Sequence, residues 1–235
     1  MNIVVIGGSG GIGMGLVKTI LKNNQTCIVH ATYRKICPEL NDDRLNWHQL
    51  DVTKEEDFKS LSADLKKINW IINCVGMLHT KEKGPEKAIR AIEPDFFLDN
   101  FRINTLPTLL IAKYFSRSLL GSTATIFAVI SAKVGSIEDN RLGGWYSYRA
   151  SKAALNMAIK TISLEWQYKV PNCCIAALHP GTTDTQLSAP FQANVATKKL
   201  FSADQTAALL LDVIGNLNSK NSGKFWNWDG KEIPW

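Results

Sequence analysis

The pattern that most constrains the fold of this 235-residue chain is an alternation of short apolar runs with amphipathic helical runs. Seven runs are predicted as strands: residues 2–6, 26–32, 47–50, 70–75, 123–130, 173–178 and 225–228. Five stretches are predicted as helices: residues 13–22, 53–65, 95–119, 148–168 and 202–217. Strands that are apolar throughout and alternate with helices indicate a parallel sheet covered on both faces. We therefore predict an α/β fold, a doubly wound, parallel seven-stranded sheet formed by one domain over residues 1–235.

Local signals mark the ends of some of these helices. Thr53 with Glu56, and Ser202 with Gln205, have the spacing of capping boxes, in which the first side chain bonds an amide of the opening turn. Pro107 lies inside the predicted helix 95–119, where it is expected to kink or locally open the helix because proline has no N–H.

Composition argues against several other classes of protein. The chain is 45% apolar and 20% charged, which are ordinary globular values rather than those of disorder or a coiled coil. No apolar run approaches the length of about 18 residues that a membrane span requires, and we expect no signal peptide. The net charge of +6 is scattered, so we expect neither a nucleic-acid nor a membrane partner. Five cysteines without a CxxC pair suggest reduced thiols in a cytoplasmic protein, and no metal site.

Glycines are concentrated where the first strand is predicted to end and the first helix to begin, in the run 7–13. Glycines in a strand–turn–helix context allow a tight turn and a close approach of the backbone to a pyrophosphate at the helix N-terminus. This place, beyond the carboxyl end of a strand, is also where ligands bind in doubly wound sheets. We predict that a dinucleotide binds here through Gly7, Ser9, Gly10, Gly11, Ile12 and Gly13.

Tyr148 and Lys152 are four positions apart in the predicted helix 148–168, so their side chains can lie on the same helical face. A phenol has a pKa of about 10 and is a poor proton relay at neutral pH. A nearby ammonium favours the phenolate and is expected to lower that pKa. The pair can then donate a proton to a carbonyl oxygen as hydride arrives, or accept one in the reverse direction.

The glycine spacing and the tyrosine–lysine pair together resemble one family. Gly7, Gly11 and Gly13 form a GxxxGxG, and Tyr148 and Lys152 form a YxxxK, which are motifs of the short-chain dehydrogenase/reductase family. The resemblance implies a single Rossmann-type domain with helices on both faces of the sheet and chemistry that needs no metal. It also implies that Tyr148 is the general acid and base.

Other matches to the family follow in chain order. Residues 73–76 (Asn-Cys-Val-Gly) stand where the family has NNAG, so two of its four positions are changed. Residues 180–185 match the family's PGxxxT. Within the family, residues 143–148 and 226–230 resemble the C-factor and carbonyl-reductase-like branch. The resemblance therefore covers essentially the whole chain.

The resemblance implies roles for further residues. Lys152 is expected to bond the nicotinamide ribose, and Asn104 to hold a water that links Lys152 to solvent. Asp51 is expected to accept from the adenine amino group, with the Val52 backbone beside the ring; alternatively, Asp51 is a helix N-terminal carboxylate near Thr53. The remaining residues expected at the cofactor are Asn73, Val75, Gly76, Pro180, Gly181, Thr183 and Thr185.

The end of the second predicted strand bears on the choice of dinucleotide. NAD-specific sites usually place an acidic residue there for the ribose 2′-hydroxyl, whereas an arginine accommodates a 2′-phosphate. The segment 31–35 has no carboxylate, and Arg34 offers the planar donor fork that suits a phosphate. We therefore predict NADP(H) rather than NAD(H) as the cofactor.

The catalytic serine is where this sequence departs from the family. The family has a serine pair after the fifth strand, and its second serine bonds the substrate carbonyl. Here Ala132 occupies that second place, and the two candidates that could replace it are Ser131 and Ser136. We favour Ser131, because a residue at the end of a strand is held more rigidly than one in a loop.

We conclude from the sequence that the chain is an NADP-dependent oxidoreductase that transfers a hydride between nicotinamide and a small carbonyl or alcohol substrate. Loops 132–145 and 184–200 are expected to select the substrate, with Trp145 as a wall of the site and the second loop as a mobile lid. Two alternatives stay open: a dinucleotide-binding signalling protein of C-factor type with weak or no turnover, and an NAD-dependent alcohol dehydrogenase. By the resemblance, a homo-oligomer through the fourth and fifth helices is also expected.

Overall fold

The sheet has seven strands in the order β3-β2-β1-β4-β5-β6-β9, and every neighbouring pair is parallel. The computed structural model describes residues 1–121, 123–194, 196 and 199–235. The strands are β1 (Asn2–Ile6), β2 (Ile28–Tyr33), β3 (Leu45–Gln49), β4 (Trp70–Asn73), β5 (Thr125–Ile130), β6 (Cys173–His179) and β9 (Lys224–Asn227). The order of the strands reverses between β1 and β4, as in a doubly wound sheet, so the predicted fold class is confirmed.

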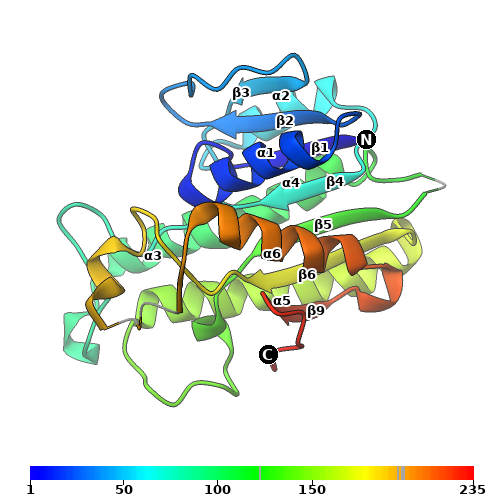
Figure 1. The fold of residues 1–235 in the computed structure, drawn as a ribbon. Helices are drawn as coiled ribbons and strands as arrows, with labels where there is room; N and C mark the ends of the chain where they lie inside the picture. Colours follow the sequence, from blue (N-terminus) through cyan, green and yellow to red (C-terminus); the bar gives the residue numbers. More distant parts are fainter. Residues whose placement is uncertain (122, 195, 197–198) are drawn as a thin grey trace.

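Helices cover both faces of this sheet. They are α1 (Gly11–Asn23), α2 (Glu55–Asp64), α3 (Pro94–Asn104), α4 (Leu106–Phe115), α5 (Tyr146–Lys169) and α6 (Ala203–Asn216). Figure 1 shows α1 and α6 in front of the sheet. Helices α2, α4 and α5 contribute to the core on the opposite face, and α3 contacts α5.

The two faces of the sheet bury separate hydrophobic clusters. In β1, Ile3 and Val5 belong to the cluster of α1 and α6, whereas Val4 and Ile6 belong to that of α2, α4 and α5. Successive side chains of a strand point to opposite faces, so a strand between two helical layers must be apolar at every position. This is why the strand runs in the sequence show no polar alternation.

The local opening expected near Pro107 is confirmed, and it divides the predicted helix 95–119 into two helices that break at Thr105. Pro107 is the second residue of α4, where its missing N–H costs no hydrogen bond. The capping box at Thr53 does not form, because the Thr53 amide donates to Asp51 Oδ1 rather than to Glu56 and the cap position of α2 is Lys54. The capping box that Ser202 opens is confirmed.

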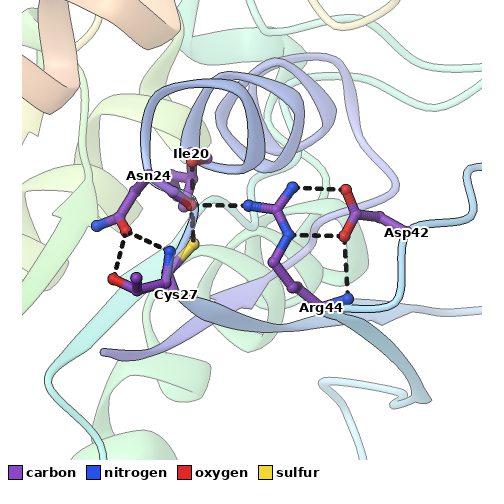
Figure 2. Close-up of polar contacts among 6 residues, drawn as sticks. Ile20, Asn24, Cys27, Asp42 and Arg44 are labelled. Carbon is purple, nitrogen blue, oxygen red and sulfur yellow. Dashed lines mark hydrogen bonds and ion pairs between the residues drawn. The ribbon is translucent and has the colours of Figure 1, made fainter.

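A polar cluster holds the segment that leads into β3 (Figure 2). The guanidinium of Arg44 donates two hydrogen bonds to the carboxylate of Asp42, at 2.9 and 2.7 Å, and one to Asn24 O at 2.8 Å. The Arg44 amide also donates to Asp42. These bonds tie the segment before β3 to the end of α1.

In the described part of the chain, no helix is both long and apolar enough to cross a membrane. Leu106 and Leu109 of α4, and Met157 and Leu164 of α5, are apolar side chains exposed on the surface. They lie on the two helices through which pairing is expected, and the homo-oligomer stays a prediction.

Candidate active site

The glycine run forms an open cradle at the N-terminus of α1. Gly7 has a φ of +78°, and the Gly10 amide donates to Gly7 O at 3.1 Å, which closes the turn. The cap position of α1 is Gly10, which offers no side-chain cap to the first amides of the helix. The free amides and the positive end of the helix dipole therefore suit an anion such as a pyrophosphate.

The cradle is too tight for side chains. A Cβ atom on Gly13 would lie 2.2 Å from Gly7 O, and one on Gly11 would lie 2.5 Å from a Thr185 side-chain atom. The loop after β6 therefore closes over the glycine run. This arrangement fits a dinucleotide, because the backbone itself forms the surface that the phosphates would approach.

We expect a Gly13→Ala variant to lose stability by about 1–3 kcal/mol, because the new methyl group has no room beside Gly7 O. Dinucleotide binding should weaken as well, since the turn must move. Urea unfolding and a cofactor titration measure the two effects. The matched control is Gly215→Ala in α6, where no atom lies within 4 Å of the new Cβ. Equal stability of the two variants would contradict the prediction.

Thr32 at the end of β2 holds the cradle in place. Its Oγ1 accepts from the Gly7 amide at 2.8 Å, and its carbonyl oxygen accepts from the Ser9 amide at 3.2 Å. Beyond it, Arg34 and Asp51 line the same cavity of about 750 Å³. The residue predicted at the 2′-phosphate and the residue predicted at the adenine therefore lie in one cavity.

Asp51 is fixed by its neighbour, as the alternative interpretation of this residue expects. Its Oδ1 accepts from the amide of Thr53 at 3.0 Å and from the Thr53 hydroxyl at 2.8 Å. These hydrogen bonds hold the pKa of Asp51 below its ordinary value. The carboxylate next to Val52 is therefore ionised at neutral pH and can accept from a ligand.

Tyr148 and Lys152 lie side by side in α5, with 7% and 2% of their surfaces exposed. Lys152 Nζ lies 5.9 Å from the centre of the Tyr148 ring and donates to Ile130 O, at the end of β5, at 2.9 Å. Burial lowers the pKa of Lys152 to about 8. Burial also raises the pKa of Tyr148 above its ordinary value, so the net effect of the surroundings is opposite to the lowering expected from Lys152.

Asn104, at the end of α3, fixes the loop after β4 with its side chain. Its Oδ1 accepts from the Met77 amide at 2.7 Å, and its Nδ2 donates to Met77 O at 2.9 Å and to Ser151 Oγ at 2.9 Å. A Cβ on Gly76 would lie 3.6 Å from Asn104 Oδ1 and 3.7 Å from Lys152 Nζ. Gly76, Asn104 and Lys152 therefore meet at one place.

Asn73 has a structural contact at the end of β4. Its Nδ2 donates to Thr108 Oγ1 in α4 at 3.0 Å, and its Oδ1 accepts from the Val75 amide at 3.1 Å. These bonds set the path of the strand end that carries Gly76.

The two candidate serines are both buried, but they lie in different settings. Ser131 Oγ donates to Asn156 Oδ1 in α5 at 2.6 Å, and its amide bonds Leu178 O of β6 at 2.8 Å. Ser136 Oγ accepts from the amide of Asp139 at 3.1 Å, within a turn. Ser131 directly follows Ile130, the acceptor of Lys152.

The residues after β6 adjoin the glycine cradle. Pro180 is followed by Gly181, whose φ is +74° and whose Cβ would clash with Phe201. The hydroxyl of Thr183 is engaged in a contact within the protein, because it shares a hydrogen bond of 2.8 Å with the hydroxyl of Thr206 in α6. Strands β7 (Thr182–Thr183) and β8 (Leu200–Phe201) pair at the base of the expected lid; in this loop, residues 195, 197 and 198 lie outside the described residues.

Aromatic rings from three segments lie in a row that begins beside Tyr148. The ring of Trp145 lies 6.2 Å from that of Tyr148 and 5.1 Å from that of Phe191, and Phe191 lies 5.8 Å from His79, all between ring centres. Figure 1 shows the segments after β4 and after β6 together at the left-hand end of the sheet. We call Trp145, Phe191 and His79 the aromatic wall.

Sequence reasoning missed Glu86, which is buried and bonds to the first turn of α5. Its partner Ser147 is 61 positions away, and no spacing or local pattern in the sequence connects the two. Sequence reasoning placed only Trp145 in the wall beside Tyr148, without its partners.

Comparison with known proteins decides the family. The family model described as short chain dehydrogenase matches residues 1–196, most of the chain. This chain belongs to the short-chain dehydrogenase family. Among relatives of this short-chain dehydrogenase, 1-hydroxy-2-glutathionyl-2-methyl-3-butene dehydrogenase of Rhodococcus sp. is 30% identical over 190 residues, 79% of this chain and 78% of that protein.

Two further matches confirm the resemblance to the C-factor and carbonyl-reductase-like branch. The C-signal of Myxococcus xanthus is 32% identical over 135 residues, 57% of this chain and 76% of that protein. The NADPH-bound carbonyl reductase from chicken fatty liver has a TM-score of 0.84 and 27% identity, covering 100% of this chain and 94% of its own. This short-chain dehydrogenase is thus an oxidoreductase by family. Its described residues contain no group of three or more side chains that could hold a metal.

Proposed function

We propose that this protein is an NADP(H)-dependent reductase of a small carbonyl compound, with Tyr148 as its general acid. The observation that carries the proposal is the buried pair in α5: Lys152 Nζ lies 5.9 Å from the Tyr148 ring, at the end of the sheet where the glycine cradle opens. Two buried proton-bearing groups side by side in such a place are typical of a catalytic site rather than of a structural contact.

The residues that would hold the dinucleotide are the cradle 7–13, Arg34 and Asp51, with the segments 73–76 and 180–185 on the nicotinamide side. When bound, the nicotinamide supplies or accepts the hydride. NADPH in the chicken carbonyl reductase supports this choice of cofactor.

The protein's own residues handle the proton. The phenol of Tyr148 is protonated at neutral pH, since its pKa lies above the ordinary value of about 10, and it can donate to the oxygen of a carbonyl. Lys152, with a pKa of about 8, is charged at pH 7 and stabilises the phenolate that is left. The break between α3 and α4 supports the proposed water at Asn104. In an unbroken helix the Thr108 amide would donate to the carbonyl oxygen of Asn104, but here it donates to Thr105 O at 3.2 Å. The Asn104 carbonyl oxygen can therefore accept from a water.

The aromatic wall indicates the shape of the substrate. Trp145 and Phe191 present flat apolar surfaces next to Tyr148, which suit a carbonyl compound with a flat apolar substituent. The direct test of the function is a panel of aromatic and aliphatic aldehydes and ketones, with NADPH and NADH consumption followed side by side. No consumption of either cofactor with any member of the panel would reject the proposal.

We expect Arg34→Asp to weaken NADPH binding by about 1.5–3 kcal/mol, because a charged hydrogen bond to the 2′-phosphate is lost. The affinity for NADH should change little, since it has no phosphate there. Fluorescence titration with each dinucleotide measures the two dissociation constants. The control is Lys18→Asp on the exposed surface of α1, which makes the same change in net charge. Equal losses for NADPH and NADH would point to the NAD-dependent alternative.

The signalling alternative is supported by the likeness to C-signal. A signalling protein would bind the dinucleotide in the same glycine cradle as a reductase, so cofactor binding does not separate the two interpretations. They differ in whether the Tyr148 hydroxyl is needed for biological activity, which the tyrosine variant described in the Discussion decides.

A further inference from the structure

We infer that Glu86 is a positioning residue for Tyr148, acting from outside α5 through the first turn of that helix. The inference rests on the proposed function, because Tyr148 is its general acid. Glu86 comes from the segment between β4 and α3 and is only 5% exposed. A buried carboxylate must be fully hydrogen-bonded to be tolerated, so its partners indicate what it does.

Both carboxylate oxygens of Glu86 bond to Ser147, the second residue of α5. The Ser147 amide donates to Oε2 at 3.1 Å, and the Ser147 hydroxyl donates to Oε1. Ser147 itself is fully buried. Trp145, at the cap position, forms no side-chain cap, so Glu86 supplies the acceptor that a capping residue normally provides. Charged bonds of this kind at a helix N-terminus are also favoured by the helix dipole.

The backbone of Glu86 holds the strained cap residue of α5 as well. Its carbonyl oxygen accepts from the Trp145 amide at 2.5 Å. Trp145 has a φ of +52°, in the left-handed region, where a bulky residue persists only if its surroundings hold it. The ring of this same residue contacts both Tyr148 and Phe191. One glutamate thus fixes the cap residue and the next turn of the helix that carries the phenol.

These contacts predict which property changes when Glu86 is lost. Tyr148 directly follows Ser147, so a shift of the first turn moves the phenol. Lys152 is one turn further on and is anchored separately to Ile130 O. The dinucleotide cradle is formed by the glycine run at the N-terminus of α1, a different part of the chain. The loss should therefore lie in kcat, whereas the affinity for the cofactor stays the same.

The test compares Glu86→Ala and Glu86→Gln with the wild-type protein, at temperatures well below their unfolding midpoints. We expect Glu86→Ala to lower kcat by about 10- to 100-fold, the scale of a misplaced catalytic group, with the NADPH dissociation constant unchanged within about twofold. Glu86→Gln should restore most of the activity, because its amide oxygen still accepts from the Ser147 amide and its NH₂ can donate to the Ser147 hydroxyl.

The matched control is Asp42→Ala, which removes a carboxylate that also accepts from a backbone amide and a side chain (Figure 2). Asp42 precedes the amino end of β3, whereas the candidate site lies at the carboxyl ends of the strands. This variant should keep the wild-type kcat. Hydrogen exchange of the α5 amides at 147–149 should accelerate in Glu86→Ala and not in Asp42→Ala. Should Glu86→Ala fail to fold, Ser147→Ala removes one of the two carboxylate contacts and should lower kcat in the same way, to a smaller degree.

The inference is overturned if Glu86→Ala keeps the wild-type kcat, if Asp42→Ala loses as much, or if Glu86→Gln is no better than Glu86→Ala. It is also overturned if exchange at 147–149 is unchanged in Glu86→Ala. A failure of the proposed function looks different, because the wild-type protein itself would then reduce no carbonyl compound. The exchange measurement needs no turnover, so it still decides in that case whether Glu86 holds this turn.

Discussion

Tyr148→Phe is expected to lower carbonyl reduction by a factor of about 10²–10⁴, the usual contribution of a positioned general acid. The variant removes only the hydroxyl oxygen, so the contact between its ring and Trp145 is kept. Cofactor affinity and thermal stability should therefore stay close to those of the wild-type protein. Single-turnover reduction with NADPH bound measures the chemical step directly.

A matched control for this prediction is Tyr146→Phe, which removes a phenol from the same turn of α5. Tyr146 is not among the residues placed in the site, so its variant should keep the wild-type rate. Retention of most of the turnover by Tyr148→Phe would contradict the role of the phenol. Loss of turnover with unchanged biological activity would instead favour the signalling alternative.

Most of the fold could be predicted because its signals are local. The central strands β1, β4, β5 and β6 are buried on both sides, which makes them apolar at nearly every position, and their alternation with helices then implies parallel strands. The break at Thr105 could not be placed, because Pro107 is compatible with both a kinked helix and the first turn of a new one. The Thr53 box does not form because the Thr53 amide, from which Glu56 would have to accept, donates to Asp51 Oδ1 and the helix begins only at Glu55.

The residues of the candidate site also divide into those that local spacing predicts and those that depend on the tertiary fold. The glycine cradle and the pair of Tyr148 and Lys152 follow from spacings within one turn or one helix, and the structure places both at the carboxyl ends of the strands. Glu86 could not be found, because its bond to Ser147 spans 61 positions and depends on how the loop after β4 returns to α5. The tertiary fold also determined the pKa of Tyr148, since burial depends on neighbours that spacing does not reveal.

The role of Ser131 stays a prediction, and its surroundings support it. Its backbone is fixed in the sheet by the bond to Leu178 O, and it follows Ile130, to which Lys152 Nζ donates at 2.9 Å. Its hydroxyl proton is engaged by Asn156 Oδ1 at 2.6 Å. A developing alkoxide is a stronger acceptor than this amide oxygen, because hydrogen bonds to charged groups are about twice as strong as neutral ones. The proton can therefore turn from Asn156 to the substrate as charge develops.

We expect Ser131→Ala to lower kcat by a factor of about 10²–10³, the loss found for one donor to a developing oxyanion, with saturating NADPH. Ser136→Ala is the matched control, since it removes an equally buried hydroxyl from the neighbouring turn. Because Ser136 accepts from the Asp139 amide, its own proton is not used in that bond, and this makes it the competing candidate. A large loss in Ser136→Ala with little change in Ser131→Ala would transfer the role to Ser136. Small losses in both variants would mean that Tyr148 acts without a serine, as the alanine at position 132 allows.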